Sequence, residues 1–193
     1  MTNRSNINST ATAAATLIPA GTWSVDPAHS TVGFAVKHLG IATVRGRFEQ
    51  CEGTLEIGDD LSAARAFGTA QVNSINTDEP ARDEHLRSAD FFGAESNPEL
   101  RFESTAIRPL DEDTFEIEGE LSMNGVTNPI TLTAVVQGTE TDPWGNKRVG
   151  IEVIGQLKRG DWNMTFNQAL GSGNLLVGEK VTLTLDISAV KQA

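Results

Sequence analysis

The sequence predicts an all-β domain of about eight short antiparallel strands, arranged as a barrel or a sandwich. Glycine is frequent, at 18 of 193 residues, and the strand-forming residues Val, Ile, Thr and Phe recur in short runs. Apolar and polar residues alternate within these runs, as they do in strands with one buried face. Turn signals such as Asn124-Gly125 separate the runs. A chain of this length and pattern is expected to fold as one unit.

The strands can be placed in order along the chain. Residues 31–39 alternate cleanly, with Phe34 and Val36 on one face. Residues 44–55 are long for one strand, and Gly53 suggests a bulge or bend. Residues 181–189 show the clearest alternation, with the apolar side chains from Val181 to Ile187 facing inward. The eight predicted strands are residues 31–39, 44–55, 64–75, 100–108, 114–123, 130–138, 149–159 and 181–189.

One helix is predicted at residues 78–89, between the third and fourth strands. Thr77 or Asp78 can cap it, and Pro80 suits its first turn. Residues 1–20 are rich in Ser, Thr, Ala and Asn and are expected to form a flexible tail, which leaves 21–193 as the domain.

The formal net charge of −11 disfavours nucleic acid and anionic membrane surfaces as partners, since the longest cationic cluster is Arg45 to Arg47. The single cysteine, Cys51, permits no internal disulfide. The N-terminus lacks the features of a secretory signal, and no segment has the ~20 apolar residues needed to span a bilayer. We therefore expect a cytoplasmic protein without stable membrane insertion. A homodimer formed through a sheet edge or a barrel mouth is left open.

An eight-stranded barrel is either filled by its side chains or holds one small ligand. Several positions predicted to face inward carry small residues, which favours a cavity. These positions are Ala66, Gly68, Ala70, Ser104, Ala134 and Gly155. Aromatic residues are spread over many elements, and the absence of tyrosine predicts a lining that selects by shape and length.

Catalytic chemistry is not indicated. His29 and Ser30 are adjacent, so in a strand they would point to opposite faces, and Cys51 has no base nearby in sequence. The three histidines, His29, His38 and His85, have no recognised metal-ligand spacing. We expect no metal, no cofactor and no enzyme activity. A haem barrel using His38, or a lipid-modifying enzyme, remains an alternative.

Several motifs follow one another in order along residues 22–193. They are Trp23-Ser24-Val25-Asp26-Pro27-Ala28-His29-Ser30, Val32-Gly33-Phe34-Ala35-Val36-Lys37-His38-Leu39, Asn76-Thr77, Arg82-Asp83-Glu84-His85-Leu86-Arg87-Ser88-Ala89-Asp90-Phe91-Phe92, Gly119-Glu120-Leu121-Ser122-Met123-Asn124-Gly125-Val126-Thr127-Asn128-Pro129, Trp144-Gly145 and Leu176-Val177-Gly178-Glu179-Lys180-Val181. Together, these motifs resemble the YceI-like family of lipid and polyisoprenoid binders.

This resemblance implies an extended, lipocalin-like, eight-stranded antiparallel β-barrel with one short helix near a barrel end, an apolar tunnel and no established catalytic activity. One position departs from the family pattern, because Asn163 stands where glycine is usual. Asparagine tolerates left-handed backbone geometry, so the turn should survive.

The predicted ligand is a polyisoprenoid, an isoprenoid quinone precursor or a fatty acyl lipid. The predicted apolar contacts, with Phe91 and Phe92 at the mouth, are Phe34, Val36, Phe48, Phe91, Phe92, Phe102, Leu132, Ile151, Trp162 and Phe166. Arg82, His85 and Arg87 are candidates for a polar head group, or they brace the helix through hydrogen bonds. The competing hypothesis is an interaction protein whose barrel is filled by its own side chains.

Overall fold

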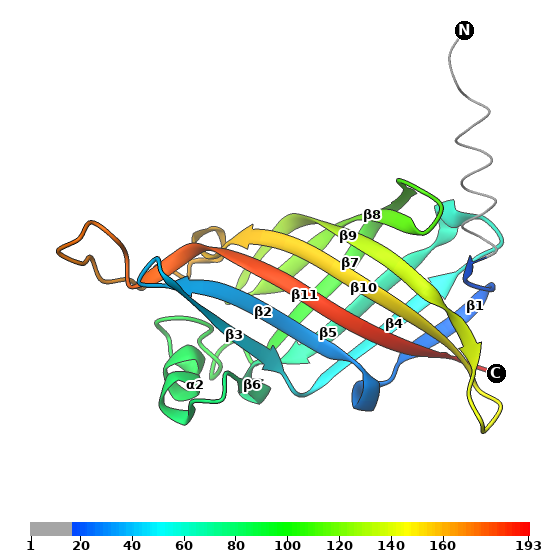
Figure 1. Ribbon diagram of the computed structural model, residues 1–193, viewed down its shortest axis with the longest axis horizontal. Coiled ribbons are helices and arrows are strands. Elements are labelled where there is room, and N and C mark those ends of the chain that lie inside the picture. Colours follow the sequence, from blue (N-terminus) through cyan, green and yellow to red (C-terminus); the bar gives the residue numbers. More distant parts are fainter. Residues whose placement is uncertain (1–16) are drawn as a thin grey trace, which may run out of the picture.

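The computed structural model describes residues 17–193, which form a closed, eight-stranded antiparallel β-barrel with one α-helix (Figure 1). The predicted barrel is therefore confirmed, and the sandwich is excluded. The helix is α2 (Pro80–Arg87). The strand segments are β1 (Gly21–Val25), β2 (Thr31–His38), β3 (Ala42–Phe48), β4 (Cys51–Ile57), β5 (Arg65–Gln71), β6 (Ile75–Asn76), β7 (Glu99–Pro109), β8 (Thr114–Met123), β9 (Val126–Thr141), β10 (Lys147–Lys158) and β11 (Val177–Lys191).

Three of the barrel strands are interrupted, which is why eleven segments make eight strands. β1 and β2 pair with successive parts of the same strand, β11, and β1 also pairs with β4 to close the barrel. β3 and β4 are consecutive segments separated only by Glu49 and Gln50. β5 and β6 are separated by the short 3-10 helix η3 (Val72–Ser74).

The bend expected within residues 44–55 exists, but its predicted position at Gly53 was wrong. The chain leaves the strand at Glu49 and Gln50, whose backbone N–H groups donate to the carbonyl oxygen and the hydroxyl of Ser74. These bonds replace the ladder bonds of a continuous strand. Gly53 itself lies within β4, where it pairs with Gly68 of β5.

The helix is shorter than predicted, and neither Thr77 nor Asp78 is its N-cap. The cap is Glu79, whose carboxylate accepts a hydrogen bond from Ala81 N–H at 3.3 Å. Thr77 instead donates its N–H and its hydroxyl to the buried carboxylate of Asp83, at 2.9 and 2.6 Å. Pro80 occupies the first turn as expected.

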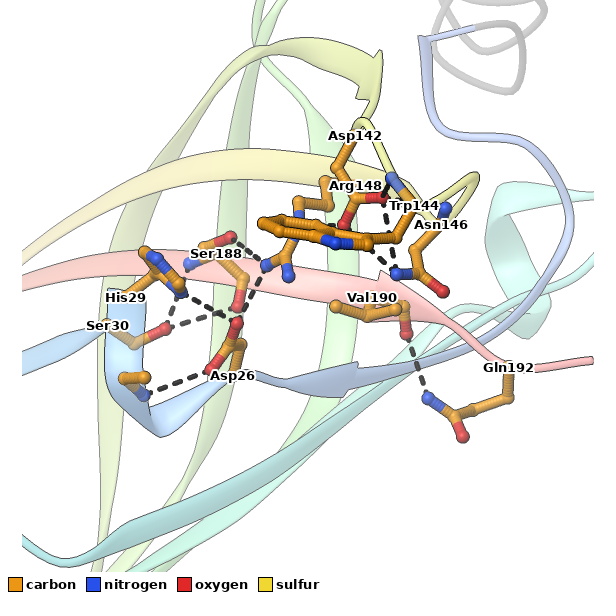
Figure 2. A network of polar contacts seen from close by, with 11 residues as sticks. Asp26, His29, Ser30, Asp142, Trp144, Asn146, Arg148, Ser188, Val190 and Gln192 are labelled. Carbon is orange, nitrogen blue, oxygen red and sulfur yellow. Dashed lines mark hydrogen bonds and ion pairs between the residues drawn. The ribbon is translucent and has the colours of Figure 1, made fainter.

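The two ends of the barrel are built differently, as Figure 1 shows. At the end that carries α2, the β2–β3 hairpin and the loop of residues 163–176 project along the long axis; we call this the tip end. The other end carries the β9–β10 turn and the C-terminus; we call it the network end, after the polar contacts in Figure 2.

Arg148 is the centre of that network. It donates to Asp26 at 2.7 Å and to Asp142 at 2.9 Å, so it joins the β1–β2 corner to the β9–β10 turn. Ser30 and Ser188 exchange two further bonds, which fasten the corner to β11. The contacts lie where β1 pairs with β11 and close the barrel (Figure 2).

Ile18 belongs to the folded part of the chain, although it falls within the tail predicted at residues 1–20. Its side chain is only 7% exposed and packs in the main core with Trp23, which is 0% exposed. The Trp23 indole N–H donates to the carbonyl oxygen of Pro19 at 3.1 Å, which fixes this entry segment. The rest of that tail, residues 1–16, lies outside the described residues.

Candidate ligand-binding cavity

The barrel encloses a cavity of about 330 Å³. Its lining is formed almost entirely by apolar side chains that alternate inward along the strands. Leu86 of α2 lines it at the tip end, and Ile18 lines it near the network end. The cavity therefore runs along the barrel, from one end toward the other, and suits a long apolar molecule.

Eight of the ten predicted apolar contacts line the cavity. They are Phe34, Val36, Phe48, Phe91, Phe92, Phe102, Leu132 and Ile151. Trp162 and Phe166 lie elsewhere. Trp162 is buried beside the cavity and donates its indole N–H to the Leu121 carbonyl oxygen at 2.8 Å. Phe166 packs outside it, against His85 and Phe91, with ring centroids 4.8 and 5.3 Å away.

Two of the lining phenylalanines lie across glycines on the neighbouring strands. A Cβ on Gly46 would overlap the ring of Phe34, and one on Gly119 would lie 2.6 Å from the ring of Phe102. The two glycines thus leave room for the aromatic rings to lie flat against the wall. Phe34 then meets Phe48, which in turn meets Phe92, at centroid distances of 5.8 and 5.7 Å.

Small residues create part of the space, as predicted, but not at every position. Ala66, Gly68, Ala70 and Ala134 line the cavity. Ser104 is buried, but its hydroxyl accepts the Ala66 N–H at 2.9 Å and it does not line the cavity.

Much of the lining was missing from the predicted set. The inward residues of β11, together with Leu55 of β4 and Ile107 of β7, contribute a large part of the wall. Their alternation is evident in the sequence, but the predicted contacts favoured aromatic residues and omitted these aliphatic ones. Ile18 carried no such signal, because it precedes the first strand.

The three predicted head-group residues are engaged by the protein itself. Arg82 donates to the hydroxyl and the carbonyl oxygen of Thr77 at 2.7 and 2.8 Å. Arg87 donates to the carbonyl oxygens of Asn73 and Ile75. His85 lies 2.8 Å from the Asp90 carboxylate. The two arginines brace α2 against the barrel, whereas His85 joins α2 to the segment that follows it.

Comparison with known proteins identifies the relationship that the motifs suggested. The family model described as the YceI-like domain matches residues 23–189. The chain belongs to this family. Protein YceI of Salmonella arizonae is 36% identical over 165 residues, which cover 85% of this chain and 83% of that protein.

Solved structures share the YceI-like fold. The YceI protein of Campylobacter jejuni is 26% identical, with a TM-score of 0.69 over 81% of this chain and 90% of that one. BcnA of Burkholderia cenocepacia has a TM-score of 0.75 at 19% identity, over 85% and 98% of the two chains. A polyisoprenoid binding domain from Saccharophagus degradans has a TM-score of 0.67 at 16% identity, over 88% and 98%. At these last two identities the likeness is one of fold.

The departure from the YceI-like pattern at Asn163 is accommodated as predicted. Asn163 has φ 59° and ψ 16°, in the left-handed region, and ends the 3-10 helix η4 (Arg159–Trp162). The next residue, Met164, lines the cavity.

Three polar or reactive side chains bear on the alternative hypotheses of a lipid-modifying enzyme and a haem-binding barrel. Cys51 lines the cavity, and burial raises the pKa of its thiol. Arg159 also lines it, but its guanidinium donates to the carbonyl oxygens of Met164 and Gly178 and to Glu179. His38, the axial ligand of the haem hypothesis, pairs in the sheet and does not line the cavity.

Between residues 17 and 193, no helix has the length and apolar character needed to cross a membrane.

Proposed function

We propose that this chain binds one long apolar ligand, a polyisoprenoid or another long-chain lipid, inside the barrel, and carries or stores it without modifying it. The observation that carries this proposal is the apolar cavity, which is lined from Leu86 of α2 to Ile18 at the opposite end. A filled barrel, the competing hypothesis, would not leave about 330 Å³ of space along its axis.

Burial of the chain supplies the binding free energy. Each methylene removed from water contributes about 0.8 kcal/mol before the costs of ordering the ligand. Because the lining offers few hydrogen-bond partners, selection depends on length and cross-section. A polar head group is best solvated at a barrel end, since Arg82 and Arg87 already donate to the chain's own oxygen atoms.

Family membership supports the same class of ligand. One structural relative, from Saccharophagus degradans, is described as a polyisoprenoid binding domain. The branched methyl groups of an isoprenoid give it a wider cross-section than a straight acyl chain. Phe34, Phe48 and Phe92 form an aromatic cluster that lines the cavity near α2. Contact with this cluster would depend on the ligand's cross-section.

The test is a titration of delipidated protein with geranylgeraniol and with stearic acid, followed by quenching of tryptophan fluorescence and by native mass spectrometry. We expect one molecule per chain. Ala134→Phe adds a ring to the cavity wall at a residue that is 3% exposed, and we expect it to weaken binding by about tenfold or more.

Thr133→Phe is the matched control, because it adds the same ring one position away on the exposed face of β9. We expect Thr133→Phe to bind as the unchanged protein does. If neither probe binds the delipidated protein, or if both variants bind equally well, the cavity is not the binding site and the proposal fails.

A further inference from the structure

The tip end includes two segments that carry no Asp, Glu, Lys or Arg, and we call these two segments the tip. They are residues 38–44, in the β2–β3 hairpin, and residues 162–178, in the loop before β11. In a chain with 21% charged residues and a net charge of −11, such a surface is unusual. The segments are joined, because Leu39 N–H donates to the Leu176 carbonyl oxygen and the Asn174 side chain donates to the Leu39 carbonyl oxygen, both at 3.0 Å.

Apolar side chains are exposed on this uncharged tip. Ile41, at the turn of the hairpin, is 78% exposed, and Leu175, in the loop, is 41% exposed. Both belong to segments that project beyond the barrel in Figure 1. An exposed isoleucine at such a position has a free-energy cost in water unless the surface meets another apolar phase.

Behind the tip, a row of cations crosses four adjacent strands. Lys158 of β10 pairs with Lys180 of β11, Lys37 follows on β2, and Arg45 follows on β3. All four side chains are exposed, and none has an ion-pair partner among residues 17–193. We call this row the collar. Lys37 and Arg45 lie on one hairpin, but Lys158 and Lys180 are far from them in the sequence, so only the folded sheet brings the two pairs together.

The tip is continuous with the cavity. The loop leaves the barrel at Met164 and re-enters it at Val177, and both residues line the cavity. Between them, Phe166 packs on Phe91, another lining residue, and on His85 of α2. A surface that contacts the tip is therefore next to the cavity's end.

We propose that the tip docks on a membrane surface that contains anionic phospholipids, with Ile41 and Leu175 at the boundary between head groups and acyl chains. The collar then faces the lipid phosphates. Apolar insertion combined with nearby Lys and Arg residues is the physical basis of peripheral membrane binding. Negative charge on the rest of the molecule, which includes Glu84 and Asp90 on and beside α2, is repelled by the same surface, so the protein approaches with the tip and the collar foremost. Only the purpose of docking, exchange of the ligand with the bilayer, rests on the proposed function.

The test is flotation of the full, delipidated chain with vesicles of phosphatidylcholine alone or mixed with phosphatidylglycerol. We expect binding to the mixed vesicles at low salt and its loss at high salt. The double variants Ile41→Asn/Leu175→Asn and Lys158→Glu/Lys180→Glu should each lower the bound fraction about tenfold or more, since the first removes the apolar contribution at unchanged charge and the second removes the electrostatic one.

Matched variants at the network end serve as controls. Lys147→Glu/Lys191→Glu makes the same change in net charge, and Trp144→Ala removes a side chain that is 82% exposed. We expect both to float like the unchanged protein. If the unchanged protein does not bind mixed vesicles, or if the network-end variants lose as much binding as the tip variants, docking through the tip is overturned.

The vesicles contain no cargo, so flotation and ligand binding fail separately. A tip variant that binds geranylgeraniol in solution but no longer floats has lost docking alone. Its retained probe binding also shows that it is folded.

Discussion

The two ends of the barrel are closed by different kinds of interaction. At the network end, Arg148 joins Asp26 and Asp142, and its own side chain is 25% exposed. At the tip end, buried Arg159 joins the two ends of the loop by donating to Met164 and Gly178. Residues 165–176 are held to the hairpin by one backbone and one side-chain hydrogen bond and to α2 by the aromatic contacts of Phe166. The first end therefore depends on charged hydrogen bonds between strands, whereas at the second end, beyond the bonds of Arg159, the loop depends on uncharged contacts that a small shift can break.

This difference separates stability from access. Charge-assisted hydrogen bonds with fixed geometry resist local opening, and they lie where the strand closure between β1 and β11 must hold. Among residues 17–193, no charged side chain is hydrogen-bonded to residues 165–176, so we expect the tip to be the end that opens to admit a ligand. The comparison makes three predictions, which fall in order of expected effect.

The largest effect is expected from the two tryptophans near the network end. Trp23 is 0% exposed and Trp144 is 82% exposed. Trp23→Ala should lower the free energy of unfolding by about 3–5 kcal/mol, because it leaves a cavity in the core. Trp144→Ala should change it by less than about 0.5 kcal/mol. Urea denaturation followed by circular dichroism compares them, and equal effects would contradict the fold at this end.

The second prediction concerns acid stability. Hydrogen bonds from Arg148 and His29 lower the pKa of Asp26 to about 2. Burial raises the pKa of Asp142, but hydrogen bonds from Asn146 and Arg148 outweigh it and also bring the value to about 2. Since both values lie below the unfolded pKa of about 3.9, the network's contribution is complete above that pH and is lost as pH falls toward 2.

Arg148→Met should therefore be less stable than the unchanged protein at pH 7, with a smaller difference at pH values near 2. Urea midpoints measured across this range provide the readout. Arg108→Met is the control, because Arg108 and Glu118 form an exposed pair at 2.7 Å, and exposed ion pairs contribute little to stability. A difference between Arg148→Met and the unchanged protein that does not change with pH would exclude the two carboxylates as its cause.

Most of the barrel was predictable from the sequence, because the alternation of apolar residues follows directly from the two faces of a strand. β8 occupies the predicted range, β7 extends its predicted range by one residue at each end, and β11 begins four residues earlier and ends two later than predicted. β1 was missed, because a five-residue strand leaves too short a pattern. The bend at Glu49 depends on hydrogen bonds to Ser74, which is distant in sequence, so local signals pointed to Gly53 instead.

The sequence predicted which strand side chains face the cavity, but not all of the residues that line it. Strand alternation placed Phe102 and Leu132 correctly, since a strand's facing fixes both. Trp162 and Phe166 follow β10, in η4 and in the loop after it. No strand alternation in this segment predicts where their side chains point. The collar was not predicted for a different reason. Lys37, Lys158 and Lys180 lie on neighbouring strands but form no cationic cluster along the sequence.

The smallest effect in the comparison is expected at the tip end, from Phe166→Ala. This change removes the ring contacts to His85 and Phe91, worth about 1 kcal/mol, from a half-buried side chain. Because the loop would open more often, bound geranylgeraniol should leave the protein several-fold faster, with little change in the urea midpoint. Stopped-flow transfer to vesicles measures the rate. Ile154→Ala, on the outer face of β10 where the side chain is 50% exposed and does not line the cavity, is the control and should leave the rate unchanged. Equal rates for Phe166→Ala and Ile154→Ala would mean that the ligand leaves by another route, and the network end would then be the one that opens.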